Sequence, residues 1–420
     1  MAALARVADE YGMSSQHDFG WQPVRLSGLL AATADRYPGR VAFTDQRDRR
    51  DWNGRPQIGW TYGSARAIIG RLASFLHSLK LVPRSPVGIC LANSSEACLA
   101  ILAVEQAGLT PCLLPIGWSE KELGQAVEAA HASVIITQGM LAEERPAEIF
   151  CRLAARYFGL RFVCAFGPCV PDGVIDLDRA ILETEPVHIA DGDGEPTGLV
   201  TFQMRDSVPR PIFRSNEACI AAAVTFLIAQ KIDATDRIVS LLAPDDHRSL
   251  TTGLVASLVT GATLECHGLF SAAALDAALQ DGATTHLVIP AWLEPHVAQA
   301  NLPDSVATVV LVHEAPMRFK ARTELRRNAI DALSFGELAL VARAREASGH
   351  LSFSLEDVGN NAPHLLGIRR DEEGMIHFRG TAAEIYDFEK GMPKLGARQT
   401  EWRASGFKAD LFAGVVIGVR

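Results

Sequence analysis

Short apolar runs alternate with longer amphipathic segments along the first half of the chain. The apolar runs predict buried strands at residues 87–91, 110–114 and 133–137. The segments between them predict helices at 96–107 and from Ser119 to about residue 131, where Ser119 and Glu122 form a capping-box pattern. Short apolar strands separated by helices are typical of βαβ units, so we expect a mostly parallel sheet.

A second set of the same kind follows a turn-rich segment at 189–197, which we interpret as a linker. The predicted strands of this set are 199–202, 237–242, 263–266, 286–289 and 306–312. Its predicted helices are 217–230, 250–259, 272–280 and 318–328. The same alternation predicts a second α/β subdomain.

The pattern changes after about residue 334. Asp371-Glu-Glu-Gly374 lies between two short strand-like runs, which is a hairpin signal, and residues 415–417 predict a closing strand. Residues 387–401 are rich in Gly, Pro and Lys. We therefore expect a small, mainly antiparallel β subdomain, and we divide the chain into a first α/β subdomain (20–190), a second α/β subdomain (191–333) and this small subdomain (334–420).

Composition narrows the function classes. Of the 420 residues, 48% are hydrophobic and 21% are charged, which indicates a globular protein. The net charge of -9 gives no electrostatic reason for a nucleic-acid partner. The eight cysteines contain no Cys-x-x-Cys pair and the histidines no ligand spacing, so we expect free thiols and no metal site. Because residues 1–22 lack a signal-peptide pattern and no apolar run approaches about 20 residues, we expect a cytoplasmic protein without membrane contact.

Several segments, in order, carry a family pattern. They are Trp60–Tyr62, Leu72–Leu76, Val87–Ser94, Ile101–Gly108, Ser119–Leu123, Pro244–His247, Gly253, Gly261–Thr263, Val288–Pro290 and Glu314–Pro316. Together they resemble the AMP-forming acyl-activating superfamily, which includes acyl-CoA synthetases and aryl-CoA ligases. The resemblance covers nearly the whole chain and implies the large N-terminal domain of these enzymes, with two doubly wound βαβ subdomains and a small antiparallel one.

The resemblance implies a phosphate-binding loop, rich in Thr, Ser and Gly and ending in Pro-Lys, at residues 202–210. Glycines in such a loop let backbone N–H groups approach the phosphates. Here Met204 and Ser207 stand at the glycine positions, and Asp206 adds a carboxylate where a polyanion would lie. The candidate phosphate contacts are Arg205, Ser207 and Arg210. Two interpretations stay open: an altered phosphate loop, and a strand and loop that no longer bind ATP, which we favour.

A second motif of the family, aromatic-Gly-x-Thr-Glu, supplies a Glu for Mg²⁺ and backbone contacts to the acyl adenylate. The resemblance places it at Phe335-Gly-Glu-Leu-Ala339, so Phe335, Gly336 and Glu337 are candidate nucleotide contacts. Ala339 replaces the magnesium-binding Glu. Glu337 lies two residues earlier, about 6.6 Å away along an extended segment, and is a poor substitute.

The resemblance also implies a ribose-binding motif and a loop near the adenine. Trp402–Phe407 resembles the ribose motif, but Phe407 stands where an Asp would accept hydrogen bonds from the ribose, and Asp410 lies three positions later. Glu314 lies in the segment that resembles the loop near the adenine, and it is the candidate contact there. Residues 416–420 resemble the strand leading into the interdomain hinge, so we expect the small C-terminal domain with its adenylation lysine to be absent.

The acyl pocket is the implied feature that these changes leave intact. The resemblance places His247 at its edge, and Phe270, Ile289 and Trp292 lie nearby in sequence. A capping or core role for His247 stays open as the alternative.

One leading hypothesis and two alternatives follow. The leading hypothesis is an acyl-CoA synthetase-like protein, impaired in adenylation, that binds an acyl or aryl acid, an acyl thioester, or a protein partner over an exposed cleft. The first alternative is an ATP-dependent, AMP-forming acid–thiol ligase that is completed by a lysine-bearing domain on another chain. It would use ATP or AMP, Mg²⁺ and CoA or an acyl thioester. The second alternative is a non-catalytic structural partner.

Overall fold

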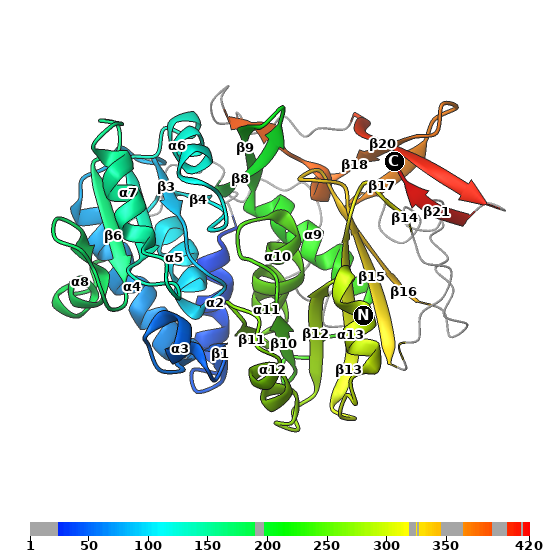
Figure 1. Ribbon diagram of the computed structural model, residues 1–420, viewed down its shortest axis with the longest axis horizontal. Coiled ribbons are helices and arrows are strands. Elements are labelled where there is room, and N and C mark those ends of the chain that lie inside the picture. The colour runs from blue at the N-terminus through cyan, green and yellow to red at the C-terminus, as the bar shows by residue number, and fades with distance from the viewer. Residues whose placement is uncertain are drawn as a thin grey trace, which may run out of the picture.

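The computed structural model describes residues 24–189, 197–318, 325, 327–345, 364–388, 401–412 and 415–420. Within these residues the strands form two eight-stranded sheets and one five-stranded sheet (Figure 1). The α-helices are α2 (Leu26–Arg36), α3 (Arg49–Asn53), α4 (Tyr62–Ser78), α5 (Ser95–Gln106), α6 (Glu120–Ala129), α7 (Pro146–Ala154), α8 (Leu177–Glu183), α9 (Asn216–Ala229), α10 (His247–Ser249), α11 (Val255–Thr260), α12 (Ala272–Leu279) and α13 (Glu294–Gln299). The π-helical turn η1 (Leu250–Leu254) joins α10 to α11, and η2 (Ala291–Leu293) and η3 (Thr381–Ala383) are 3₁₀ turns.

The first large sheet has the strand order β19-β9-β8-β4-β3-β5-β6-β7. Its strands are β3 (Pro86–Ile89), β4 (Thr110–Leu113), β5 (Val134–Gln138), β6 (Phe162–Phe166), β7 (Ile175–Asp176), β8 (Gly198–Arg205), β9 (Val208–Ser215) and β19 (Tyr386–Asp387). Pairing is parallel from β8 through β7, whereas β9 joins β8 and β19 in antiparallel pairs. The strand order reverses at β3, which has β4 on one side and β5 on the other.

The second large sheet has the order β16-β15-β13-β12-β10-β11-β1-β2. Its strands are β1 (Val41–Asp45), β2 (Gly59–Thr61), β10 (Arg237–Ser240), β11 (Thr263–Cys266), β12 (Thr285–Pro290), β13 (Val306–Glu314), β15 (Asn328–Ser334) and β16 (Leu340–Ala344). The inner pairs are parallel, and β2 and β16 close the two ends in antiparallel pairs. The strand order reverses at β10, and ligands of open α/β sheets bind near the carboxyl ends of strands at such a reversal.

The third sheet is antiparallel and has the order β14-β21-β20-β18-β17. Its strands are β14 (Met317–Arg318), β17 (Gly367–Arg370), β18 (Met375–Arg379), β20 (Arg403–Phe412) and β21 (Val415–Val419). In Figure 1 this small sheet lies at the upper right, at the end of the molecule that holds the C-terminus.

Helices α2, α4, α5, α9 and α11 lie between the two large sheets and share one core with both. Helix α5 is buried around its whole circumference, from Ser95 to Glu105, because sheets and helices surround it. Helices α6 and α7 cover the outer face of the first sheet, and α12 and α13 cover the outer face of the second. The result is five alternating layers, with the small sheet packed at one end through a separate core.

Most predicted elements are confirmed. Strands form within the predicted runs of both α/β sets, the capping box of Ser119 and Glu122 opens α6, and the hairpin at Asp371–Gly374 joins β17 to β18. The helix predicted at 318–328 is wrong at its described ends, because Arg318 ends β14 and Asn328 begins β15. Most of the predicted linker at 189–197 and of the Gly-, Pro- and Lys-rich segment at 387–401 lies outside the described residues.

The sheets cross the predicted subdomain boundaries. Strands β1 and β2, near the start of the chain, belong to the second sheet, whereas β8 and β9 belong to the first. The two α/β halves are therefore interleaved rather than consecutive.

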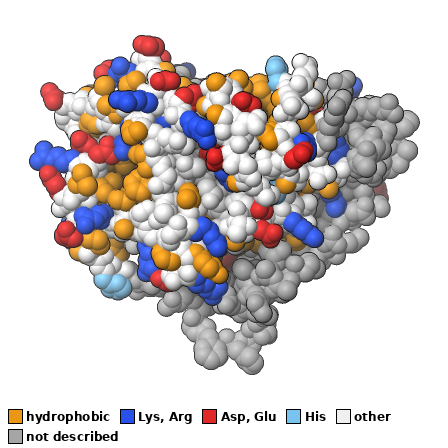
Figure 2. Space-filling model, turned by 90° about the horizontal axis from the view of Figure 1, so that it is seen from below, with side chains coloured by type: hydrophobic (Ala, Val, Ile, Leu, Met, Phe, Trp, Pro, Cys, Tyr) orange, Lys and Arg blue, Asp and Glu red, His pale blue; other side chains and the backbone are white. Residues whose placement is uncertain are grey.

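The described helices include none that is both long and apolar enough to cross a bilayer. On the face shown in Figure 2, acidic and basic side chains are interspersed over the described part, beside a group of apolar side chains at the left.

Candidate nucleotide and acyl site

A tight hairpin occupies the place of the expected phosphate loop. Strands β8 and β9 remain paired up to Arg205 and Val208, so only Asp206 and Ser207 form the turn. Both turn residues have positive φ, 49° and 60°, as a two-residue turn of the primed type requires. The candidate phosphate contacts Arg205, Ser207 and Arg210 lie exposed at and near this tip. Pairing between β8 and β9 engages alternate backbone groups up to the turn and keeps both strands extended. Consecutive N–H groups therefore do not converge on one point, as they would in a loop that surrounds a phosphate.

In the segment after β15, the side chain of Glu337 points into the protein interior and does not face solvent. Gly336 takes a positive φ of 58°, and the Glu337 side chain is only 7% exposed. Thr201 Oγ1 on β8 donates a hydrogen bond to Glu337 Oε2 at 2.5 Å, and Arg214 on β9 donates to the Glu337 main-chain oxygen. Burial raises the pKa of Glu337 to about 7, and the nearby Asp246 carboxylate adds to this rise. Glu337 thus joins three segments that are far apart in sequence.

The positions assigned to magnesium and ribose are apolar and packed. Ala339, at the magnesium position, is completely buried in the core of the small sheet. Phe407, at the ribose position, packs edge-on against Phe335 with ring centroids 6.1 Å apart, and Phe335 also contacts Phe378 at 4.8 Å. These aromatic side chains pack against one another, and none of them has an atom that accepts a hydrogen bond from a sugar hydroxyl. These described residues do not fit a bound Mg²⁺-nucleotide.

Glu314, the candidate adenine contact, is held by an arginine. Arg248 Nη1 lies 2.7 Å from Glu314 Oε2, and Arg248 also pairs with Asp246. The ion pairs link the loop after β10 to the end of β13. Since Arg248 lies directly after His247, these ion pairs also hold the start of α10 in place.

His247 is buried, with 1% exposure, at the carboxyl end of β10, where the strand order reverses. Its Nδ1 lies 3.1 Å from Thr251 Oγ1, and its backbone N–H donates to Glu337 Oε1 at 3.5 Å. Its Nε2 is buried without a hydrogen-bond partner among the described residues. Burial lowers the pKa of His247 well below its usual value, and the nearby Arg214 and Arg248 lower it further, so the ring is neutral at pH 7.

The other three candidate pocket residues do not gather around His247. Ile289 is completely buried in the core under α12 and α13, whereas Phe270 and Trp292 are 64% and 71% exposed. A cavity of about 20 Å³ does lie beside α10, η1 and the end of β10. It is lined by Asn93, Cys98, Ser240, Pro244, Leu250 and Gly253, among others. Its volume suits about one water molecule.

Comparisons with known proteins agree with this architecture. Residues 30–157 match the model of the AMP-binding enzyme family. A linear gramicidin synthase polypeptide of Brevibacillus parabrevis is 25% identical over 84% of this chain, and the salicyl-AMP ligase of Mycobacterium tuberculosis is 26% identical over 58%. The chain spans only 4% and 42% of the lengths of these two proteins.

Solved structures give the same result for the fold. The apo structure of Mycobacterium smegmatis MbtA superimposes with a TM-score of 0.75 at 17% identity, over 99% of this chain and 78% of that one. The o-succinylbenzoate-CoA synthetase of Bacillus subtilis, solved with ATP and magnesium, gives 0.70 at 15% identity, over 95% and 99%. These likenesses show that the chain shares the fold of these two enzymes.

The structure also reveals site residues that the sequence does not indicate. Thr201 and Arg214 hold Glu337 from β8 and β9, and Asp246 raises its pKa. Arg214 is completely buried, and its guanidinium donates to the main-chain oxygens of Ala382 and Glu337. A charged residue directly after the apolar pair Ile212-Phe213 is the one signal that the sequence offers.

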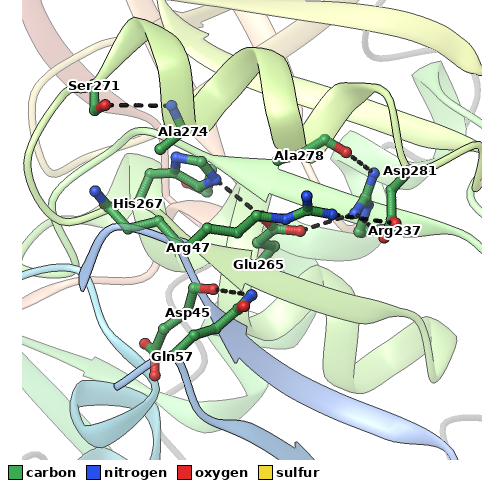
Figure 3. Close-up of polar contacts among 12 residues, drawn as sticks. Asp45, Arg47, Gln57, Arg237, Glu265, His267, Ser271, Ala274, Ala278 and Asp281 are labelled. Atoms are coloured by element: carbon green, nitrogen blue, oxygen red, sulfur yellow. Dashed lines mark hydrogen bonds and ion pairs between the residues drawn. The ribbon is translucent and has the colours of Figure 1, made fainter. Parts of the chain in front are cut away.

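In a second buried polar cluster, the carboxylate is paired at both of its oxygens. Figure 3 shows Arg237, Glu265 and His267 pointing toward one another, with Asp281 at the rim. Arg237 Nη1 lies 3.0 Å from Glu265 Oε2, and His267 Nε2 lies 3.1 Å from Glu265 Oε1. Each acceptor oxygen of Glu265 therefore has a donor. This cluster joins β10 to β11, from Arg237 at the start of β10 to His267 beside its last residue.

Metal binding has no geometric basis in the part of the chain that the structure describes. No group of three or more His, Cys, Asp or Glu side chains is arranged there to hold an ion.

Proposed function

We propose that this chain is an acyl-CoA synthetase-like binding domain that does not form acyl adenylates. The observation that carries the proposal is the two-residue turn at Asp206 and Ser207, where the resemblance calls for a glycine-rich phosphate loop. A phosphate loop works by presenting several unpaired backbone N–H groups to the polyanion. Here the β8–β9 ladder extends to the turn.

Three further features support it independently. Ala339 is buried at the position of the magnesium carboxylate, and Phe407 packs on Phe335 at the position of the ribose acceptor. Glu314 forms an ion pair with Arg248, which would have to be broken or shared for Glu314 to contact a ligand. Restoring nucleotide binding would therefore require changes at four separated places.

The size of the cavity beside α10 bears on the class of ligand. The space of about 20 Å³ beside α10 holds about one water molecule, so this cavity by itself does not hold an acyl or aryl acid.

Pyrophosphate exchange tests the proposal. The purified chain is incubated with Mg²⁺-ATP, labelled pyrophosphate and a panel of aryl and acyl acids, with the salicyl-AMP ligase and salicylate as the positive control. We expect exchange no faster than in a reaction without protein. Acid-dependent exchange by the purified chain would overturn the proposal and support the acid–thiol ligase alternative.

A further inference from the structure

Two arginines of the small sheet share one tryptophan ring. The guanidinium carbon of Arg369, on β17, lies 4.6 Å from the ring centroid of Trp402, and that of Arg379, on β18, lies 4.5 Å from it. Both are cation–π contacts. The indole ring is thus a common platform that holds two positive charges in place.

Strand register explains how the three side chains meet. Gly367 pairs with Arg379, and Phe378 pairs with Arg403, so Gly367, Arg379 and Trp402 lie in a row across β17, β18 and the start of β20. A Cβ at Gly367 would lie 2.9 Å from Arg379 Cγ and 3.4 Å from Trp402 Cη2. The missing side chain at Gly367 therefore makes room for Arg379 and Trp402 over β17.

The two guanidinium groups are available to a ligand. Arg369 and Arg379 are exposed, and neither forms an ion pair with any residue in the described ranges. Of the neighbouring acids, Asp371 pairs with His377 at 2.8 Å. Two like charges at one ring repel each other, and an anion would relieve this repulsion. A guanidinium stacked on a ring keeps its N–H edge free for a carboxylate.

Among the described residues, the outer backbone edge beside these arginines has no strand partner. Strand β17 lies at the end of the small sheet, and in the described part of the chain it pairs with β18 alone. An edge strand can add an extended peptide through main-chain hydrogen bonds, and alternate side chains of that peptide then face one side of the sheet. Figure 1 shows this sheet at one end of the molecule, beyond the two large sheets.

We propose that the edge of the small sheet binds an extended acidic segment of a partner protein. The backbone of the segment pairs with β17, and alternate Asp or Glu side chains lie against Arg369 and Arg379. This inference goes beyond the proposed function and stands whether or not the chain forms adenylates.

Peptide binding tests the inference. The probe is a fluorescently labelled peptide, Glu-Val-Glu-Thr-Glu-Val, and the control peptide has Gln in place of each Glu. Fluorescence anisotropy should show binding of the acidic peptide that weakens as salt rises and little binding of the Gln peptide. Replacing both arginines (Arg369→Gln with Arg379→Gln) should weaken binding about tenfold or more, and Trp402→Ala should weaken it severalfold because the platform is lost.

The matched control replaces two exposed arginines near the first large sheet, Arg152→Gln with Arg161→Gln. Arg161 also lies over a ring, that of Phe162, at 5.2 Å. We expect this control to bind the acidic peptide within twofold of the unaltered chain, and circular dichroism and thermal midpoints to be alike for all variants. Equal binding by the Arg369/Arg379 variant and the unaltered chain would overturn the inference. Tighter binding of pyrophosphate or single-stranded DNA than of the acidic peptide would do the same.

Discussion

Two buried polar regions of this molecule differ in how their charges are balanced. In the first, Arg49 lies between Asp45 and Glu96 and pairs with both, which ties β1 of the second sheet to α5. In the second, Glu337 and His247 are also buried, but the Glu337 carboxylate forms no ion pair within the described residues, and His247 Nε2 has no hydrogen-bond partner there. Burial is common to both regions, and Arg49 Nε also has no hydrogen-bond partner within the described residues, but the buried carboxylates are paired with an arginine only in the first region.

The contrast indicates that the Arg49 region supports the fold, whereas the Glu337 and His247 region belongs to the candidate site. A buried charge without a partner is costly, and such groups are concentrated where a protein binds or once bound a ligand. The Arg49 network occupies the junction of the two large sheets, where any change in pairing would weaken the fold. The Glu337 region contains the segment that resembles a nucleotide motif, and there the Glu337 carboxylate has no ion pair and His247 Nε2 has no hydrogen-bond partner within the described residues.

The largest expected effect comes from breaking the scaffold network. Arg49→Met leaves Asp45 without an arginine partner and Glu96 with Arg55 alone, and it should lower the free energy of unfolding by about 3–5 kcal/mol. Arg66→Met is the control, because its ion pair with Asp35 is exposed and should contribute less than about 1 kcal/mol. Urea unfolding monitored by circular dichroism gives both values. Equal losses for the two variants would contradict the role of the Arg49 network.

The next effect comes from restoring a carboxylate at the magnesium position. Ala339→Glu places a charge in the apolar core of the small sheet, so it should cost about 3 kcal/mol and give no Mg²⁺-dependent nucleotide binding. Ala344→Glu, at the exposed end of β16, is the control and should be nearly neutral. A stable Ala339→Glu protein that binds Mg²⁺-ATP would show that the nucleotide site is still present.

Removing the unpaired charge has a smaller effect that depends on pH. Burial raises the folded-state pKa of Glu337 from its ordinary value of 4.5 to about 7, so the folded state binds more protons than the unfolded state between these two values. Stability should therefore fall as pH rises through this window. Glu337→Gln keeps the shape without the charge and should reduce this fall by about 1–2 kcal/mol.

Asp245, whose pKa is also raised to about 7 by burial and by Asp246, keeps part of the slope in that variant. Glu314→Gln, an exposed carboxylate paired with Arg248, is the control and should leave the slope unchanged. Unfolding midpoints between about pH 5 and pH 8 give the profiles. A Glu337→Gln profile identical to that of the unaltered chain would refute an unpaired charge at this position.

The smallest effect concerns the hairpin tip. Ser207 has a φ of 60°, and glycine adopts this conformation without steric cost, so Ser207→Gly should stabilise the protein by up to about 1 kcal/mol. Met204→Gly, on the paired strand β8, should instead destabilise it. Thermal unfolding compares the two variants. Similar shifts in both would mean that residues 204–208 do not form the tight turn.

Sequence patterns predict the layered α/β architecture because apolar runs and helix caps are local signals. The β8–β9 hairpin is only partly predictable, since Pro209 and Pro211 argue against a strand and the turn carries no Asn-Gly or Asp-Gly pair. Strand β15 is not predicted because local sequence does not decide its conformation. Its neighbours β13 and β16 supply the pairing that decides its conformation.

The candidate site is less accessible to prediction. The sequence points to His247 as a core or pocket residue and the structure buries it, but its neighbour Glu337 lies 90 positions away along the chain. Phe270 and Trp292 are near the site in sequence, whereas the direction of their side chains toward solvent depends on tertiary packing. Thr201 and Arg214 acquire their significance only through the contacts of β8 and β9 with the segment after β15.

Calorimetric titration of Mg²⁺-ATP, with AMP as a parallel ligand, tests the central claim most directly. The β8–β9 turn, the buried Ala339 and the packed Phe407 predict no saturable heat from either ligand at concentrations of several millimolar. Saturable binding tighter than about 1 mM, or about -4 kcal/mol, would contradict the claim that the nucleotide site has been replaced.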